Sequence, residues 1–309
     1  MIQTLIFFWV VSALLLVWEQ KIIRVIIYLT IFSLITSACF LLLASPDVAM
    51  AEAAISTFAT IFFIVCFEKY YSLRDDASDS PPTTEKSGGV KKHILPLGFT
   101  VFLFLLFIYF IPDGTASTYL KYQYLAMFSR DVGGKNAVTA IYLGYRMYDT
   151  MLEALMLLIS VVAVAHLSWY SDTSVTDGKR SEVSRSAIAV LTIRAICPVI
   201  LLFGAYLIMN GHLTPGGGFQ GGVALASFVV CRYMIYDIYD TQAGQIIIRE
   251  KLIFAAIVLL SIFFIFLGLY NHLPQYRNTY LLAMNALIGM KVACGFIIMF
   301  YRYIAFEKR

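Results

Sequence analysis

Charged side chains that interrupt long apolar stretches are the groups in this sequence that could carry chemistry. Asp47 and Glu52 lie near the start of one such stretch, and Lys291 lies close to the middle of another. An ionised side chain is costly inside a membrane, so it usually faces an opposite charge or a hydrated path. These residues therefore predict either buried ion pairs or groups that carry ions and protons, and the sequence leaves both open.

Asp47 also has a purely structural explanation. The segment SPDVAMAEA places Pro46 and Asp47 in a first helical turn, where proline fits and an acidic group stabilises the helix N-terminus. Glu52 has no such explanation, because it lies about 10 Å inward from the helix start at the rise of an α-helix. We expect Glu52 to face a cavity or a partner group.

A second group of charges lies in the segment NAVTAIYLGYRMYDTMLE. Arg146, Asp149 and Glu153 are spaced one helical turn apart, which predicts either a stabilised ion cluster or a cation and proton relay. Thr150 and Glu153 also match a T-x-x-E capping box, which would explain Glu153 structurally. Residues 136–167 would form about 48 Å of continuous helix, too long for one span, so we expect a break near residues 144–150.

Residues 210–222, NGHLTPGGGFQGG, hold six of the 19 glycines of the chain between two apolar runs. If Pro215 opens a helix, glycines four residues apart share one face, and another helix can approach closely there. His212 adds an imidazole, the side chain that titrates near neutral pH, at the membrane boundary. The candidate packing and loop motif comprises Pro215, Gly216, Gly217, Gly218, Gln220, Gly221 and Gly222.

The elements that must position these residues are membrane helices. The chain is 60% hydrophobic and 14% charged, and its mean hydropathy is +0.80, which predicts an all-α polytopic membrane protein. The net charge of +4 is interpreted through the distribution of charged residues along the chain, and it does not indicate a nucleic-acid partner. The five cysteines show no CxxC spacing, so we expect no disulfide, metal, cofactor or catalytic site. We also expect no cleavable signal peptide.

Hydropathy predicts about nine spans, each near the roughly 20 residues that a bilayer requires. With the N-terminus outside and the C-terminus in the cytoplasm, most of the 23 lysines and arginines lie on the cytoplasmic side. The same orientation puts the glycine segment on the outer side. The predicted spans are 2–18, 22–43, 46–68, 93–111, 148–169, 187–209, 216–236, 251–270 and 280–302.

Two polar segments, 72–92 and 171–186, have the composition of flexible linkers, and they divide the spans into blocks of three, two and four. This organisation is typical of small membrane subunits fused end to end, although one transporter with long loops would also fit. The predicted units are 1–71, 93–170 and 187–309.

Three motifs resemble the subunits of Mrp-type monovalent cation/proton antiporters. NGHLTPGGGFQGG, together with NALIGMKVACG around Lys291, resembles the small B subunit. SPDVAMAEAAIS resembles the three-helix region near the C-terminal end of the large A subunit, with its A-P-D-V-A-L-T-E-A pattern. NAVTAIYLGYRMYDTMLE resembles the two-helix domain that follows there. Similar modules occur as separate chains in membrane-bound hydrogenases and complex I-like assemblies.

The resemblance implies that Asp47, Glu52, Arg146, Asp149, Glu153, His212 and Lys291 lie on or beside a path for Na⁺ and H⁺. It also implies the prokaryotic cytoplasmic membrane and a separate large antiporter-like subunit as partner. The sequence departs from the family pattern at three positions: Gly144 replaces an aspartate, Met147 a glycine and Ala51 a threonine. Loss of the aspartate removes one possible cation ligand.

Several functions stay open at this point. The chain is interpreted as a subunit of a free-standing Na⁺/H⁺ antiporter. The first alternative is a coupling subunit of a redox-driven, hydrogenase-like complex, in which separate iron-sulfur subunits would hold the redox chemistry. The second is a scaffold whose buried charges are fixed salt bridges, and the third is a solitary transporter.

Overall fold

The structure is a computed structural model that describes residues 2–75, 91–109, 118–167, 187–235, 243–266 and 274–305, and these ranges contain helices and no strand. The helices are α1 (Ile2–Trp18), α2 (Ile22–Leu42), α3 (Pro46–Asp75), α4 (Lys91–Tyr109), α5 (Thr118–Asp131), α6 (Ala137–Ala140), the π-helix η1 (Ile141–Tyr145), α7 (Met147–Leu167), α8 (Ala187–Asn210), α9 (Gly218–Ile235), α10 (Ala243–Phe266), the 3-10 helix η2 (Pro274–Tyr276) and α11 (Arg277–Ala305).

A helix lies at each of the nine predicted spans, and the all-helical, multi-pass membrane class is confirmed. Within the described residues, six helices are long and apolar enough to cross a membrane, and α1 is a shorter apolar helix of 17 residues. The count of nine spans and their orientation stay predictions. The predicted linkers fall almost entirely outside the described residues.

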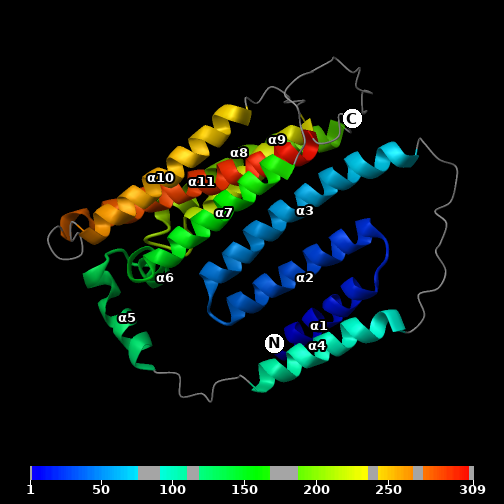
Figure 1. The fold of residues 1–309 in the computed structure, drawn as a ribbon, viewed down its shortest axis with the longest axis horizontal. Coiled ribbons are helices and arrows are strands. Elements are labelled where there is room, and N and C mark those ends of the chain that lie inside the picture. The colour runs from blue at the N-terminus through cyan, green and yellow to red at the C-terminus, as the bar shows by residue number, and fades with distance from the viewer. Residues whose placement is uncertain are drawn as a thin grey trace.

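The helices form two regions that meet along α3 and α9 (Figure 1). In the first region, α1 packs against α2 and α2 packs against α3. In the second, α9 lies between α8 and α11, and α11 also contacts α7 and α10. Helix α4 lies apart from α7 in this view, although the sequence grouped the two in one block (Figure 1). The second region therefore carries most of the interior.

Glycines let α9 approach a different helix on each side. A Cβ atom added at Gly222 would lie 2.5 Å from the carbonyl oxygen of Gly289 on α11, and one at Gly221 would lie 2.7 Å from the carbonyl oxygen of Gly204 on α8. The predicted close helix contact is therefore confirmed. Pro215 does not open this helix. Helix α9 begins at Gly218, and the chain first turns through Gly216, whose φ of 136° is accessible to glycine alone at little cost.

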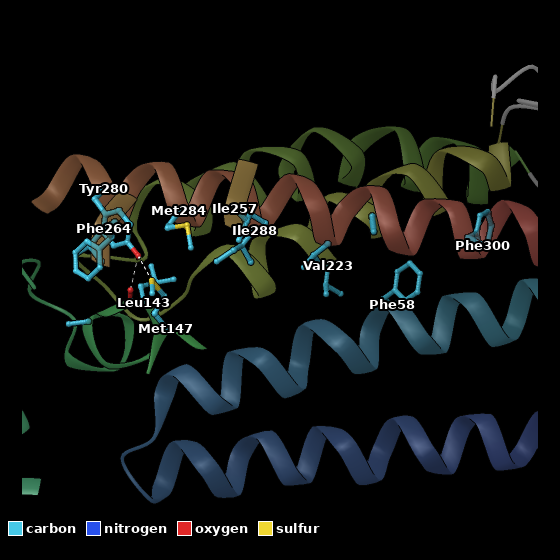
Figure 2. Close-up of a cluster of buried hydrophobic side chains, with 14 of the residues drawn as sticks. Phe58, Leu143, Met147, Val223, Ile257, Phe264, Tyr280, Met284, Ile288 and Phe300 are labelled. Carbon is cyan, nitrogen blue, oxygen red and sulfur yellow. Dashed lines mark hydrogen bonds between the residues drawn. The ribbon is translucent and has the colours of Figure 1, made fainter. Parts of the chain in front are cut away.

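The largest hydrophobic cluster follows α11 (Figure 2). Phe300, Ile288 and Met284 of α11 line it, with side chains from α3, η1, α7, α9 and α10. At one end the rings of Tyr280 and Phe264 stack with centroids 4.1 Å apart. The Tyr280 hydroxyl donates a 2.9 Å hydrogen bond to the carbonyl of Leu143, so this end of the core holds η1 against α11.

Candidate functional site

Asp47 and the glycine segment meet at the side-chain amide of Asn136. The Asn136 amide nitrogen lies 2.9 Å from the Asp47 carboxylate, 3.2 Å from the Gly211 carbonyl and 3.0 Å from the Thr214 carbonyl. The backbone N–H of Gly216 donates a further 3.0 Å hydrogen bond to the same Asp47 oxygen. Asp47 lies in the first turn of α3, as the sequence predicts. Its carboxylate thus joins α3, the segment before α6 and the loop before α9.

A second junction joins α9, η1 and α11 at Asn285. Asn285 on α11 accepts hydrogen bonds through its side-chain oxygen from the Tyr142 hydroxyl (2.9 Å) and from the N–H of Gly218 (3.2 Å). Asn285 is fully buried. This neutral polar contact therefore fixes η1, α11 and the start of α9 to one another.

His212 takes part in the junction through its backbone. Its carbonyl accepts hydrogen bonds from the N–H groups of Lys135 and Asn136, at 2.9 and 3.1 Å. The Nδ1 atom of the His212 side chain is buried and has no hydrogen-bond partner within the described ranges. The structure thus gives His212 a backbone role, and its place on an ion path stays a prediction.

Glu52 has a partner, as predicted, but the partner is a neutral hydroxyl. Ser33 on α2 donates a hydrogen bond to its carboxylate, and Ser33 is buried while Glu52 is half-buried. Thr30 and Thr60 make a second contact between α2 and α3, with their hydroxyl oxygens 2.8 Å apart. A pairing of α2 and α3 through polar side chains therefore places Glu52 between the two helices.

The predicted break between residues 144 and 150 is confirmed as a π-helix. Residues 141–145 form η1, and the N–H of Arg146 bonds to the carbonyl of Ile141 five residues back. A Cβ atom at Gly144 would lie 2.5 Å from a methyl group of Val132, which is fully buried. Gly144 is therefore required by packing, and an aspartate there would displace Val132.

Arg146 and Asp149 form the predicted ion pair, with 2.5 Å between Arg146 Nε and Asp149 Oδ2. Glu153 lies one turn further along α7, is exposed, and has no hydrogen bond or ion pair among the residues that the structure describes. The capping-box explanation of Glu153 is wrong. Thr150 lies inside α7 rather than at its start, and its hydroxyl donates to the carbonyl of Tyr142.

Two partly open cavities, each of about 260 Å³, meet at Glu153. One is the more polar of the two, although its wall is still mostly apolar, and its wall residues include Tyr142, Arg146 and Asp149. The other is largely apolar, lies between α3, α7, α9 and α11, and includes Gln220 among its wall residues. Glu153 is the one residue that both share. Neither cavity is lined by Glu52 or Lys291, so the predicted site residues form separate groups.

Of the two surroundings that the depth of Lys291 predicts, an opposite charge or a hydrated path, the structure shows an opposite charge, the carboxylate of Glu250 on α10. The ammonium group forms an ion pair with Glu250 Oε1, and the two side chains are 1% and 0% exposed. The Lys291 nitrogen also lies 5.2 Å from the centroid of the Phe254 ring. The second carboxylate oxygen, Oε2, is buried and has no hydrogen-bond partner in the described residues.

The sequence analysis missed Glu250, Asn136, Tyr142 and Asn285. Glu250 was missed because the predicted span began at residue 251, whereas α10 begins at Ala243 and carries Glu250 two turns into the helix. Its position in the triplet Arg249-Glu250-Lys251 beside an apolar run was the available signal. The other three are neutral, and their sequence gives no sign of the contacts they make.

Comparison with known protein families identifies two parts of the chain. Residues 188–307 match a domain related to the MnhB subunit of Na⁺/H⁺ antiporters. Residues 7–71 match the MbhD family, described as the D subunit of MBH. Both matches fall where the sequence predicts the four-helix and three-helix units.

Related proteins and structures cover different shares of the chain. The putative antiporter subunit mnhA2 of Staphylococcus aureus is 26% identical over 165 residues, which is 51% of this chain but only 19% of that protein. A chain of the Mrp complex from Dietzia sp. DQ12-45-1b has the same fold over 99% of this chain and 35% of its own length, with a TM-score of 0.74 and 14% identity. A chain of the archaeal membrane-bound sulfane sulfur reductase is 25% identical, with a TM-score of 0.57 over 69% of this chain and 97% of its own.

Proposed function

We propose that this chain, in which an MnhB-related domain follows an MbhD domain, is a membrane subunit of an Mrp-type cation/proton antiporter and contributes to ion translocation within a multisubunit complex. The two family matches and the relatedness to mnhA2 support this assignment. In keeping with the resemblance, the transported ions are Na⁺ and H⁺, the membrane is the prokaryotic cytoplasmic membrane, and the partners are other Mrp-type subunits, including a large antiporter-like one.

The observation that carries the proposal is the unpaired carboxylate of Glu153. An ionised group within a membrane helix normally has a partner or a hydrated path. Arg146 is engaged by Asp149, so Glu153 remains available to a cation or a proton. It lies where the two cavities meet, which gives an ion access from the polar side that Arg146 and Asp149 line.

The remaining charged residues have separate parts in this proposal. Asp47 holds the three units together at Asn136, so that the cavities beside Glu153 keep their shape. Glu52 offers a second carboxylate, which Ser33 holds between α2 and α3. Lys291 belongs to a proton-handling site with Glu250. His212 lies on the outer side in the proposed nine-span orientation.

A second function is favoured by the likeness to the sulfane sulfur reductase. That protein is a respiratory membrane complex, and this chain covers 97% of the matching chain at 25% identity. In that case the same carboxylates would couple electron transfer in separate iron-sulfur or hydrogenase-type subunits to ion pumping. The proteins that co-purify with the tagged native chain decide between the two: antiporter subunits alone support the first, and iron-sulfur subunits support the second.

The test of the ion path uses the purified native complex in sealed vesicles. Glu153→Gln should abolish sodium-dependent proton movement while the complex assembles with unchanged composition. The control is Ser160→Ala, which alters the wall of the same apolar cavity but removes no charge. Normal transport by an assembled Glu153→Gln complex would contradict the role of Glu153 on the ion path.

A further inference from the structure

The pair formed by Glu250 and Lys291 is the most deeply buried charged group in the described residues. Both side chains rank among the largest that are fully buried, and they join α10 to α11. Removing two ions from water costs more than their attraction returns unless every polar atom is satisfied. Here one atom is not, because Glu250 Oε2 is buried without a hydrogen-bond partner. The hydrogen-bonding capacity of Oε2 is therefore unused.

The free oxygen suits a proton and not a metal cation. A sodium ion at Oε2 would lie close to the Lys291 ammonium and be repelled by it in a medium of low dielectric constant. It would also need several further oxygen ligands, and Oε2 is a buried oxygen with no hydrogen-bond partner in the described residues. A proton needs only the one oxygen and very little space.

The surroundings of Glu250 are consistent with this selectivity. On α10 its neighbours Arg249 and Lys251 are exposed, and on α11 Cys294 lies near it. The acidic and imidazole side chains of α7, which also packs against α10, are Asp149, Glu153 and His166; Glu153 and His166 are exposed, and Asp149 is partly exposed.

The pair lies near the start of α10, and so close to one side of the membrane. Glu250 lies seven residues after the first residue of α10, which is about 10 Å along the helix. The exposed Arg249 and Lys251 mark the level at which basic side chains reach toward the membrane surface. A proton therefore has a short distance to travel between Glu250 and that surface.

We propose that Glu250 and Lys291 form a proton-exchange site, selective against metal cations, that opens to the side of the membrane on which α10 begins. The inference rests on the proposed transport function. Within that function it assigns the proton to Glu250 and the metal cation to Glu153. When a proton binds Glu250 Oε2, the carboxylate becomes a carboxylic acid and the pair changes from net zero charge to one positive charge on Lys291. Release of that proton restores the ion pair.

The first test is infrared difference spectroscopy of the purified complex, which needs no transport. Acidification should produce the carbonyl stretch of a protonated carboxylic acid, and Glu250→Gln should remove that signal. Lys251→Gln, a change at the exposed neighbour, should leave it in place. If the wild-type signal is unaffected by Glu250→Gln, the proposed site is wrong.

The second test separates the two ions in vesicles. Glu250→Gln should abolish Na⁺/H⁺ exchange and leave the exchange of labelled Na⁺ for Na⁺ intact. Because a single substitution can prevent folding, the double variant Glu250→Met with Lys291→Met serves as the uncharged, similarly sized version of the pair, and it should show the same loss. If the double variant exchanges Na⁺ for H⁺ as the wild type does, the pair is structural. If an assembled variant complex loses both exchanges, the proposed selectivity is wrong. If the wild-type complex exchanges neither ion but keeps the Glu250-dependent infrared signal, the transport function fails and the proton site stands.

Discussion

Glu153 and Glu250 are both acids on long helices with a basic residue in reach, and the tertiary structure gives them opposite surroundings. Arg146 lies two turns before Glu153 on the same helix, yet it pairs with Asp149 and leaves Glu153 exposed between two cavities. Lys291 lies 41 positions from Glu250 in the chain and pairs with it in the interior. Closeness in sequence therefore does not determine which charge neutralises which.

The difference follows from where each helix packs. Helix α7 begins beside η1 at the edge of the core, so its first turns face cavities. Helix α10 packs along α11, and the face that carries Glu250 and Phe254 is turned inward. An open carboxylate can exchange a hydrated cation with its surroundings, whereas a sealed one is limited to a proton. The two sites can thus divide the ions between them.

Breaking the sealed pair should have the largest effect. Lys291→Met leaves a buried, unpaired carboxylate, and we expect it to lower the stability of the complex by about 3–5 kcal/mol. Thermal melting in detergent and the yield of assembled complex measure this. The double variant with Glu250→Met should regain most of the loss, since an apolar pair of similar size replaces the ions. A single and a double variant of equal stability would show that the pair is not sealed.

Removing the amide that joins the regions should have the next largest effect. Asn136→Ala leaves the buried Asp47 carboxylate with one fewer donor and frees two loop carbonyls, at a cost of about 1–3 kcal/mol. Asn278→Ala is the matched control, because Asn278 is exposed and accepts only from the N–H of Gly134. Melting curves should separate the two variants, and an equally large loss for Asn278→Ala would contradict the role given to Asp47.

Separating α9 from α11 should loosen the sealed site to a moderate extent. Gly222→Ala forces a Cβ atom against the carbonyl of Gly289, next to Lys291, at a cost of about 1–3 kcal/mol. Reaction of Lys291 with an amine-specific reagent, read by mass spectrometry, should increase along with the loss in melting temperature. Gly98→Ala is the control, since a Cβ atom there meets no atom within 4 Å. If Lys291 in the Gly222→Ala variant is as unreactive as in the wild type, another contact seals the pair.

Changing the open carboxylate should have the smallest effect on stability. Glu153→Gln removes an exposed charge that has no ion pair, so the expected change is within about 0.5 kcal/mol. Arg146→Gln breaks an exposed pair and should cost about 0–1 kcal/mol. Melting curves and ion flux are measured on the same variants. We expect Glu153→Gln to lose transport while its fold stays intact. A large loss of stability at Glu153 would show that it is a structural group.

Much of the architecture could be predicted from the sequence because it follows from local patterns. Long apolar runs predicted the helices, and the length of residues 136–167 predicted a break, which the structure places at η1. Glycines four residues apart predicted the close contacts of α9. Helix starts were less predictable: α9 begins three residues after Pro215 and α10 eight residues before the predicted span, so the hydropathy pattern left Glu250 outside the membrane.

The sequence by itself determined the membrane class, the helices and the need of a deeply placed lysine for an opposite charge or a hydrated path, because the bilayer imposes these requirements on each segment separately. Only the tertiary structure decided that the opposite charge is Glu250, that Asn136 holds Asp47 to the glycine segment, and that Glu153 stays open. These outcomes depend on which helix faces meet across large separations in the chain. Side-chain pairing between helices is set by that packing, and no local pattern encodes it.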